Sequence, residues 1–129
     1  MDAQRLQGLE RYGSWERMTG GEWFLPSMPE TKKEHQRSFR LVKQLNELQN
    51  TDPERAKGIL REILPEESAV PGLHVPLNLE YGCNLVCGER VFINFGATIL
   101  AQAKVTLGDG VMMGPNCSLI TVGHPVNDH

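Results

Sequence analysis

Four side chains in the second half of the sequence carry groups suited to acid–base chemistry or polar binding: His124, Asn94, Glu80 and Gln102. His124 stands in the segment VGHPVND, and an imidazole titrates close enough to neutrality to accept a proton at physiological pH. Pro125 restricts the backbone of His124 to extended angles, which helps to fix the ring. Taken alone, a single histidine is more often an incidental surface or core residue than a base.

The other three residues offer complementary hydrogen-bonding groups. The Asn94 amide has both donors and an acceptor, which suits a ligand rich in hydroxyl groups. The Glu80 carboxylate could accept hydrogen bonds from hydroxyls or orient a base. Two competing interpretations remain: Asn94 is also typical of a turn in a repeated coil, and Glu80 of a solvated strand.

The cysteines do not form a metal-binding pattern. Cys83 and Cys87 are four residues apart, but no second pair of cysteines or histidines completes a zinc site. An odd number of separate cysteines favours small buried thiols in a cytosolic protein. We therefore expect no metal and no permanently bound cofactor.

Bulk composition narrows the possible classes of protein. The 129 residues suit one ordinary domain, and 40% apolar with 22% charged residues indicates a globular chain. The formal net charge of −3 disfavours nucleic-acid binding, which usually needs a basic surface. No apolar stretch approaches the roughly 20 residues of a membrane span, and the N-terminus lacks the apolar segment of a signal peptide. These features predict a cytoplasmic protein without a membrane partner.

A zone rich in Lys, Arg, Glu and Gln, residues 29–67, predicts a helical hairpin. Thr31 and Glu34 fit a capping box after Pro29, and apolar residues then recur at helical spacing. The first apolar face contains Phe39, Val42, Leu45 and Leu48, and the second contains Ala56, Ile59, Leu60 and Ile63. Asp52 and Pro53 suit the start of the second helix. His35 falls on the polar side, which predicts a solvated residue.

The remaining zone repeats with a period of six residues. One mostly apolar series contains Val75, Tyr81, Cys87, Ile93 and Ile99, and after a step of eight it contains Leu107, Met113 and Leu119. A second series, four residues later, is mostly small or β-branched. Such a period predicts short strands joined by tight turns, three to a triangular coil of about eighteen residues. Ordinary strands of a sandwich or barrel are the alternative, but they usually alternate with period two.

These segments resemble the maltose and galactoside O-acetyltransferase family over roughly residues 15–128. The likeness is carried by MTGGEWF, by QLNELQNTDPERAKGILREIL, and by the coil segments EYGCNLVCGERVFINFGATIL and VTLGDGVMMGPNCSLITVGHPV. The resemblance implies a mainly β fold with a helical N-terminal cap, residues 1–67. Residues 68–129 would be the first coils of a left-handed parallel β-helix, incomplete at the C-terminus.

The resemblance also implies a reaction and its participants. It implies acetyl transfer from acetyl-CoA, as co-substrate, to a sugar hydroxyl within a homotrimer. His124 matches the catalytic histidine, and Asn94 matches a position that contacts the acceptor sugar. Glu80 stands where the family has an acidic or small polar residue near the acceptor.

Two departures from the family pattern concern the acceptor. Gln102 stands where the family often has an aspartate, and Pro26 corresponds to a second acceptor-contacting aspartate. The change at Gln102 leaves open an aminosugar or another non-sugar acceptor. Since the family continues for several coils past this point, the length favours a truncated chain. A non-catalytic remnant that serves as an oligomerisation or binding module therefore stays a separate possibility.

Overall fold

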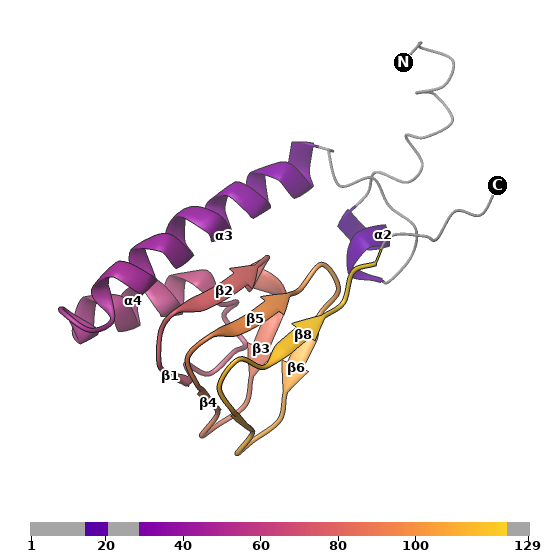
Figure 1. Cartoon of the computed structure of the whole chain (residues 1–129). Helices are drawn as coiled ribbons and strands as arrows, with labels where there is room; N and C mark the ends of the chain where they lie inside the picture. Colours follow the sequence, from indigo (N-terminus) through magenta and orange to yellow (C-terminus); the bar gives the residue numbers. More distant parts are fainter. Residues whose placement is uncertain (1–14, 21–28, 124–129) are drawn as a thin grey trace, which may run out of the picture.

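The computed structural model describes residues 15–20 and 29–123, and within them helices precede strands (Figure 1). The helices are α2 (Trp15–Thr19), α3 (Pro29–Leu48) and α4 (Pro53–Ile63). The strands are β1 (Gly72–Leu73), β2 (Leu77–Glu80), β3 (Leu85–Cys87), β4 (Phe92–Ile93), β5 (Ala97–Leu100), β6 (Val105–Leu107), β7 (Met112–Met113) and β8 (Ser118–Ile120). A short 3₁₀ helix, Gly82–Asn84, lies between β2 and β3.

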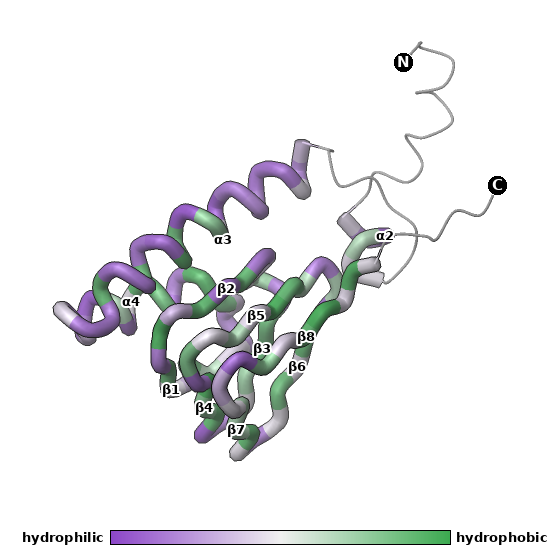
Figure 2. Tube along the Cα trace, viewed as in Figure 1, coloured by the Kyte–Doolittle hydropathy of each residue, from purple (hydrophilic) through white to green (hydrophobic). Residues whose placement is uncertain are grey.

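The predicted helical hairpin is confirmed, with one error on its first face. The Asp52 carboxylate accepts a hydrogen bond from the backbone N–H of Arg55, and Pro53 occupies the first turn of α4. Phe39, expected on the apolar face, is instead 68% exposed. Ser38 and Leu41 take the buried positions, and the outer side of α3 is polar (Figure 2). Helix α3 also begins at Pro29, ahead of the expected Thr31.

The strands wind into coils whose sides form three parallel sheets. The sheets have the orders β1–β4–β7, β2–β5–β8 and β3–β6. Leu73 pairs with Ile93 and Ile93 with Met113, so the chain returns to the same place after 20 residues. This coil is longer than the expected eighteen residues because one of its three sides takes an eight-residue step.

The longer coil corrects the phase of the predicted repeat. Ile93, Ile99, Leu107 and Met113 are buried in one apolar cluster, as the six-residue period predicted. In the first coil, however, the partner of Ile93 is Leu73 and the partner of Ile99 is Leu79. Val75 and Tyr81 were therefore assigned wrongly to the axial series. The step of eight occurs in both coils, between β2 and β3 and again between β5 and β6.

Helix α3 covers the outer edge of the first coil. The Asn46 amide donates to the carbonyl of Leu77 and accepts from its N–H, both at 2.9 Å. The Ser38 hydroxyl donates to the carbonyl of Leu79 and accepts from the N–H of Gly82. These side chains satisfy backbone groups that an uncovered edge strand would expose. A Cβ atom on Gly82 would lie 2.3 Å from the Ile63 side chain, so only glycine permits this approach.

Candidate functional site

Glu80 and Gln102 lie together where β2 and β5 end. Their parent strands pair in parallel, with Glu80 opposite Leu100, so Gln102 follows its strand by two residues. The Gln102 Nε2 donates to Glu80 Oε2 at 3.0 Å. From the cap, His35 Nε2 lies 3.3 Å from Glu80 Oε1. Both carboxylate oxygens of Glu80 are therefore engaged by side chains of this chain.

The Gln102 amide is held in place but only half satisfied. Asn84 Nδ2 donates to the carbonyl of Ala101 at 2.8 Å and lies 3.3 Å from that of Gln102, which fixes this turn. Gln102 Oε1 is buried and has no hydrogen-bond partner among the described residues. The reverse amide orientation would set Oε1 against the Glu80 carboxylate, so the orientation follows from the charge of Glu80.

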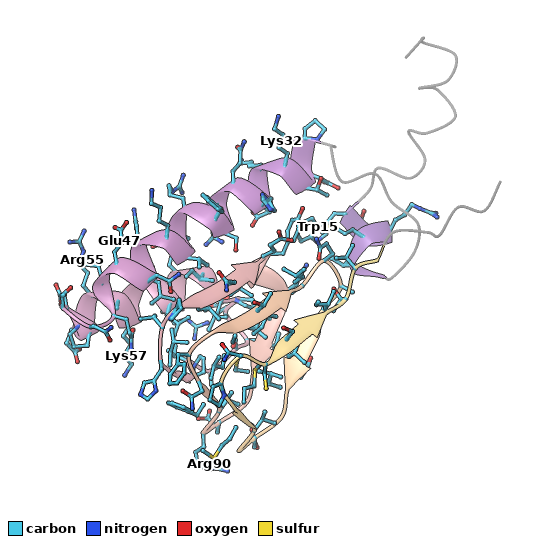
Figure 3. The ribbon with its side chains drawn as sticks, viewed as in Figure 1. Trp15, Lys32, Glu47, Arg55, Lys57 and Arg90 are labelled. Carbon is cyan, nitrogen blue, oxygen red and sulfur yellow. The ribbon has the colours of Figure 1, made fainter. Side chains whose placement is uncertain are left out.

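Aromatic rings surround this group. Tyr81 adopts left-handed backbone angles, with φ of 57°, and its ring makes edge contacts with Trp15 and His35, each at 5.7 Å between centroids. Trp15 lies near the ends of β2 and β5, whereas Arg90 lies on the opposite side of the coils (Figure 3). We call His35, Glu80, Tyr81 and Gln102 the Glu80 corner.

Burial at the Glu80 corner disfavours ionised phenol and thiol groups. Burial raises the pKa of Tyr81, and the neighbouring Glu80 charge raises it further. Burial also raises the pKa of Cys83 to about 11, with the negative charge and hydrogen bonding of Glu34 adding to the effect. Cys83 is therefore a protonated, weakly nucleophilic thiol at neutral pH.

Asn94 lies at the opposite end of β5, after β4. Its Oδ1 accepts a hydrogen bond from the backbone N–H of Phe95 at 2.9 Å and lies 3.3 Å from His74 Nδ1. The His74 ring meets Phe92 edge-on at 5.0 Å and stacks against Phe95 at 6.4 Å between centroids. We call His74, Phe92, Asn94 and Phe95 the Asn94 corner.

The structure thus brings two of the predicted residues together and separates the third. Glu80 and Gln102 share a hydrogen bond, while Asn94 stands on the other side of the four-residue strand β5, roughly 13 Å of extended chain. His124 lies outside the described residues. The roles assigned to His124, Asn94, Glu80 and Gln102 stay predictions.

Sequence reasoning missed two histidines beside these residues. His35, expected to be solvated, has 42% of its side-chain surface exposed, but it also contacts Glu80 and Tyr81 from the cap. His74 contacts Asn94 because the two residues are 20 apart, one full coil. The second contact could have been found by adding the six-, six- and eight-residue steps of the repeat. The contact of His35 had no comparable signal.

Comparisons with known proteins agree with this architecture. Residues 17–67 match the maltose acetyltransferase hexapeptide capping motif. Nodulation protein L of Rhizobium leguminosarum bv. viciae is 33% identical over 110 residues, covering 85% of this chain and 58% of that protein.

Two solved structures extend the likeness to three dimensions. A maltose O-acetyltransferase from Clostridium difficile 630 superposes with a TM-score of 0.82 at 26% identity, covering 88% of this chain and 60% of that one. A hexapeptide-repeat-containing acetyltransferase from Vibrio cholerae O1 biovar eltor was solved in complex with acetyl coenzyme A. It superposes with a TM-score of 0.67 at 28% identity, covering 82% of this chain and 57% of that one.

A helical cap followed by coils of three parallel sheets defines a hexapeptide-repeat protein of the left-handed β-helix class. Within that class, the cap and the coils match those of maltose and galactoside O-acetyltransferases, which confirms the expected resemblance. The chain spans about three fifths of the length of these relatives. Within residues 15–20 and 29–123, no helix is long and apolar enough to cross a membrane.

Proposed function

We propose that this protein is a cytoplasmic O-acetyltransferase that moves an acetyl group from acetyl-CoA to a sugar hydroxyl. The observation that carries the proposal is the continuous match of cap and coils to acetyltransferases. One of these is a maltose O-acetyltransferase and another was solved with acetyl coenzyme A. Acetyl-CoA would serve as a co-substrate rather than a resident cofactor.

His124 is the proposed general base. A sugar hydroxyl is a very weak acid, so its proton must leave as its oxygen attacks the thioester carbonyl carbon. The imidazole of His124 would take that proton. When the carbon–sulfur bond breaks, the departing coenzyme thiolate would receive the proton back. The acetyl group then remains on the sugar oxygen, and His124 is neutral again.

The acceptor would be held by Asn94, Glu80 and Gln102, and this arrangement favours an oligomer. Within one chain, Asn94 is separated from the other two by the length of β5. A head-to-tail assembly in which the Asn94 corner of one copy faces the Glu80 corner of the next would bring all three residues around one ligand. Closure of that contact after three copies gives the homotrimer that the family resemblance implies.

The decisive experiment is His124→Ala in the full-length protein, assayed for acetyl-CoA-dependent transfer to maltose. General-base catalysis contributes about 10²–10⁴-fold, so we expect the rate to fall by at least tenfold with the KM for the sugar little changed. His129→Ala, the same change five residues later, is the control and should retain wild-type activity. A loss of less than tenfold in His124→Ala would remove the proposed role.

The contacts of Gln102 also favour a second candidate acceptor, an aminosugar. With a neutral amide in place of the family's aspartate, Glu80 is the sole carboxylate of this described group, and it could pair with an ammonium group. An acetyl-CoA consumption screen over maltose, glucose, galactosides and aminosugars distinguishes the two. If no acceptor in the screen supports consumption of acetyl-CoA, a non-catalytic binding module is favoured instead.

A further inference from the structure

The Asn94 corner has a hydrogen-bonding atom that no described residue uses. His74 and Asn94 occupy equivalent positions of successive coils, and the backbone N–H of His74 donates to the carbonyl of Ile93, next to Asn94. The same step of 20 residues leads from Asn94 to Gly114. Gly114 has no side chain, and a Cβ placed there would meet nothing within 4 Å. One side of Asn94 is therefore covered by His74, and the other is open.

The Phe95 backbone fixes which way the Asn94 amide points. A backbone N–H can only donate, so the Asn94 atom that lies 2.9 Å from it must be the oxygen. The same oxygen faces His74 Nδ1 at 3.3 Å. Since an amide oxygen can only accept, Nδ1 must carry a hydrogen. In the neutral imidazole, Nε2 is then the unprotonated nitrogen.

Two phenylalanine rings hold this histidine in place. Phe92 contacts the His74 ring edge-on with an interplanar angle of 88°, and Phe95 lies nearly parallel to it at 17°. His74 is itself exposed, and Phe95 is 47% exposed. A large exposed aromatic ring beside an exposed imidazole limits the rotation of His74 without burying it.

We propose that His74 is a positioning residue that presents Asn94 Nδ2 as a hydrogen-bond donor to an oxygen of the acceptor. With Oδ1 occupied by two donors, the unused atom of the amide is Nδ2, which has no partner among the described residues. A sugar hydroxyl oxygen is a matching acceptor. His74 thereby selects acceptors that offer an oxygen lone pair at this point. This proposal rests on the proposed function, because it assumes that Asn94 contacts the acceptor.

Kinetics of two variants test the positioning role. His74→Phe keeps a flat ring between Phe92 and Phe95 but removes the donor, and His74→Asn keeps a donor near Nδ1. A single hydrogen bond contributes about 0.5–1.5 kcal/mol, so we expect His74→Phe to raise the acceptor KM by about twofold to tenfold. The KM for acetyl-CoA should not change, and His74→Asn should restore most of the acceptor affinity. An acceptor KM for His74→Phe within the error of wild type would overturn the proposal.

A spectroscopic measurement keeps this test separate from that of the proposed function. The ¹⁵N chemical shifts of the His74 ring distinguish a hydrogen on Nδ1 from one on Nε2, and they can be recorded without any substrate. We expect the Nδ1–H tautomer when the His74 ring is neutral in the wild-type protein. The Nε2–H tautomer would exclude the proposed hydrogen bond. If the shifts show Nδ1–H but no acceptor is acetylated, the proposed function fails while the local geometry stands.

Discussion

The two corners at either end of β5 contain similar groups, but they differ in how fully their hydrogen-bonding atoms are paired. Each has a histidine packed edge-on against an aromatic ring, His35 on Tyr81 and His74 on Phe92, and each places that histidine beside a polar side chain. At the Glu80 corner, both carboxylate oxygens are engaged by side chains of helix α3 and the coils. At the Asn94 corner, the polar atoms lie near the surface, and one amide nitrogen remains unused.

The origin of the histidine explains this difference. His35 comes from the cap, 45 residues before Glu80, so it joins a helix to the coils and its contact helps to hold the two parts together. His74 comes from the coil directly before that of Asn94, so its contact repeats the spacing of the fold. The contacts at the first corner therefore also stabilise the docking of the cap, whereas the free amide nitrogen at the second corner is available for a ligand.

The largest effect on stability is expected from breaking the Glu80 corner. Glu80→Ala removes the acceptor of Gln102 Nε2 and the partner of His35, beside a Gln102 Oε1 that is already unpaired. Leaving such a donor unsatisfied costs about 1–3 kcal/mol, which should appear as a lower free energy of unfolding in urea. Glu89→Ala, at an exposed carboxylate, should change that free energy by less than about 0.5 kcal/mol. Equal free energies of unfolding for the two variants would contradict the stabilising role of the Glu80 corner.

Asn94→Ala should produce the reverse pattern. Loss of the Nδ2 donor is expected to raise the acceptor KM about threefold to tenfold, whereas the free energy of unfolding should fall by less than about 1 kcal/mol. Steady-state kinetics and urea unfolding on the same preparation separate the two effects. The control is Asn78→Ala, an exposed amide that contacts Thr98. A change in stability without a change in KM would show that Asn94 is only a turn residue.

The smallest effect concerns Cys83, beside the Glu80 corner. Burial and then Glu34 raise its pKa from 9.0 to about 11, so alkylation by iodoacetamide in the folded protein should accelerate only as the pH approaches 11. Because the folded pKa exceeds the unfolded one, the stability linked to this thiol is present below pH 9 and is lost as the pH rises toward 11. Glu34→Gln should shift the alkylation midpoint to lower pH. A wild-type midpoint near 9 would show that the thiol is solvated.

Much of the fold could be predicted from the spacing of apolar residues. Ile93 and Ile99 are six residues apart, as are Leu107 and Met113, and these side chains share one buried cluster, as the period indicated. The first coil was misplaced because an eight-residue step between Leu79 and Cys87 was not recognised. Phe39 was misplaced because helical periodicity identifies a stripe but not the surface that will cover it.

The sequence by itself determined that residues 72–120 coil with aliphatic side chains inside, because that period is a property of the chain alone. The resemblance to maltose and galactoside O-acetyltransferases was also readable in the segments of the cap and the coils. Only the tertiary structure decided that Glu80 binds Gln102 and His35 while Asn94 binds His74. These contacts depend on a return of the chain after 20 residues and on the docking of a separate helix. Neither the length of the coil nor the docking of the helix is fixed by the identity of the residues that meet.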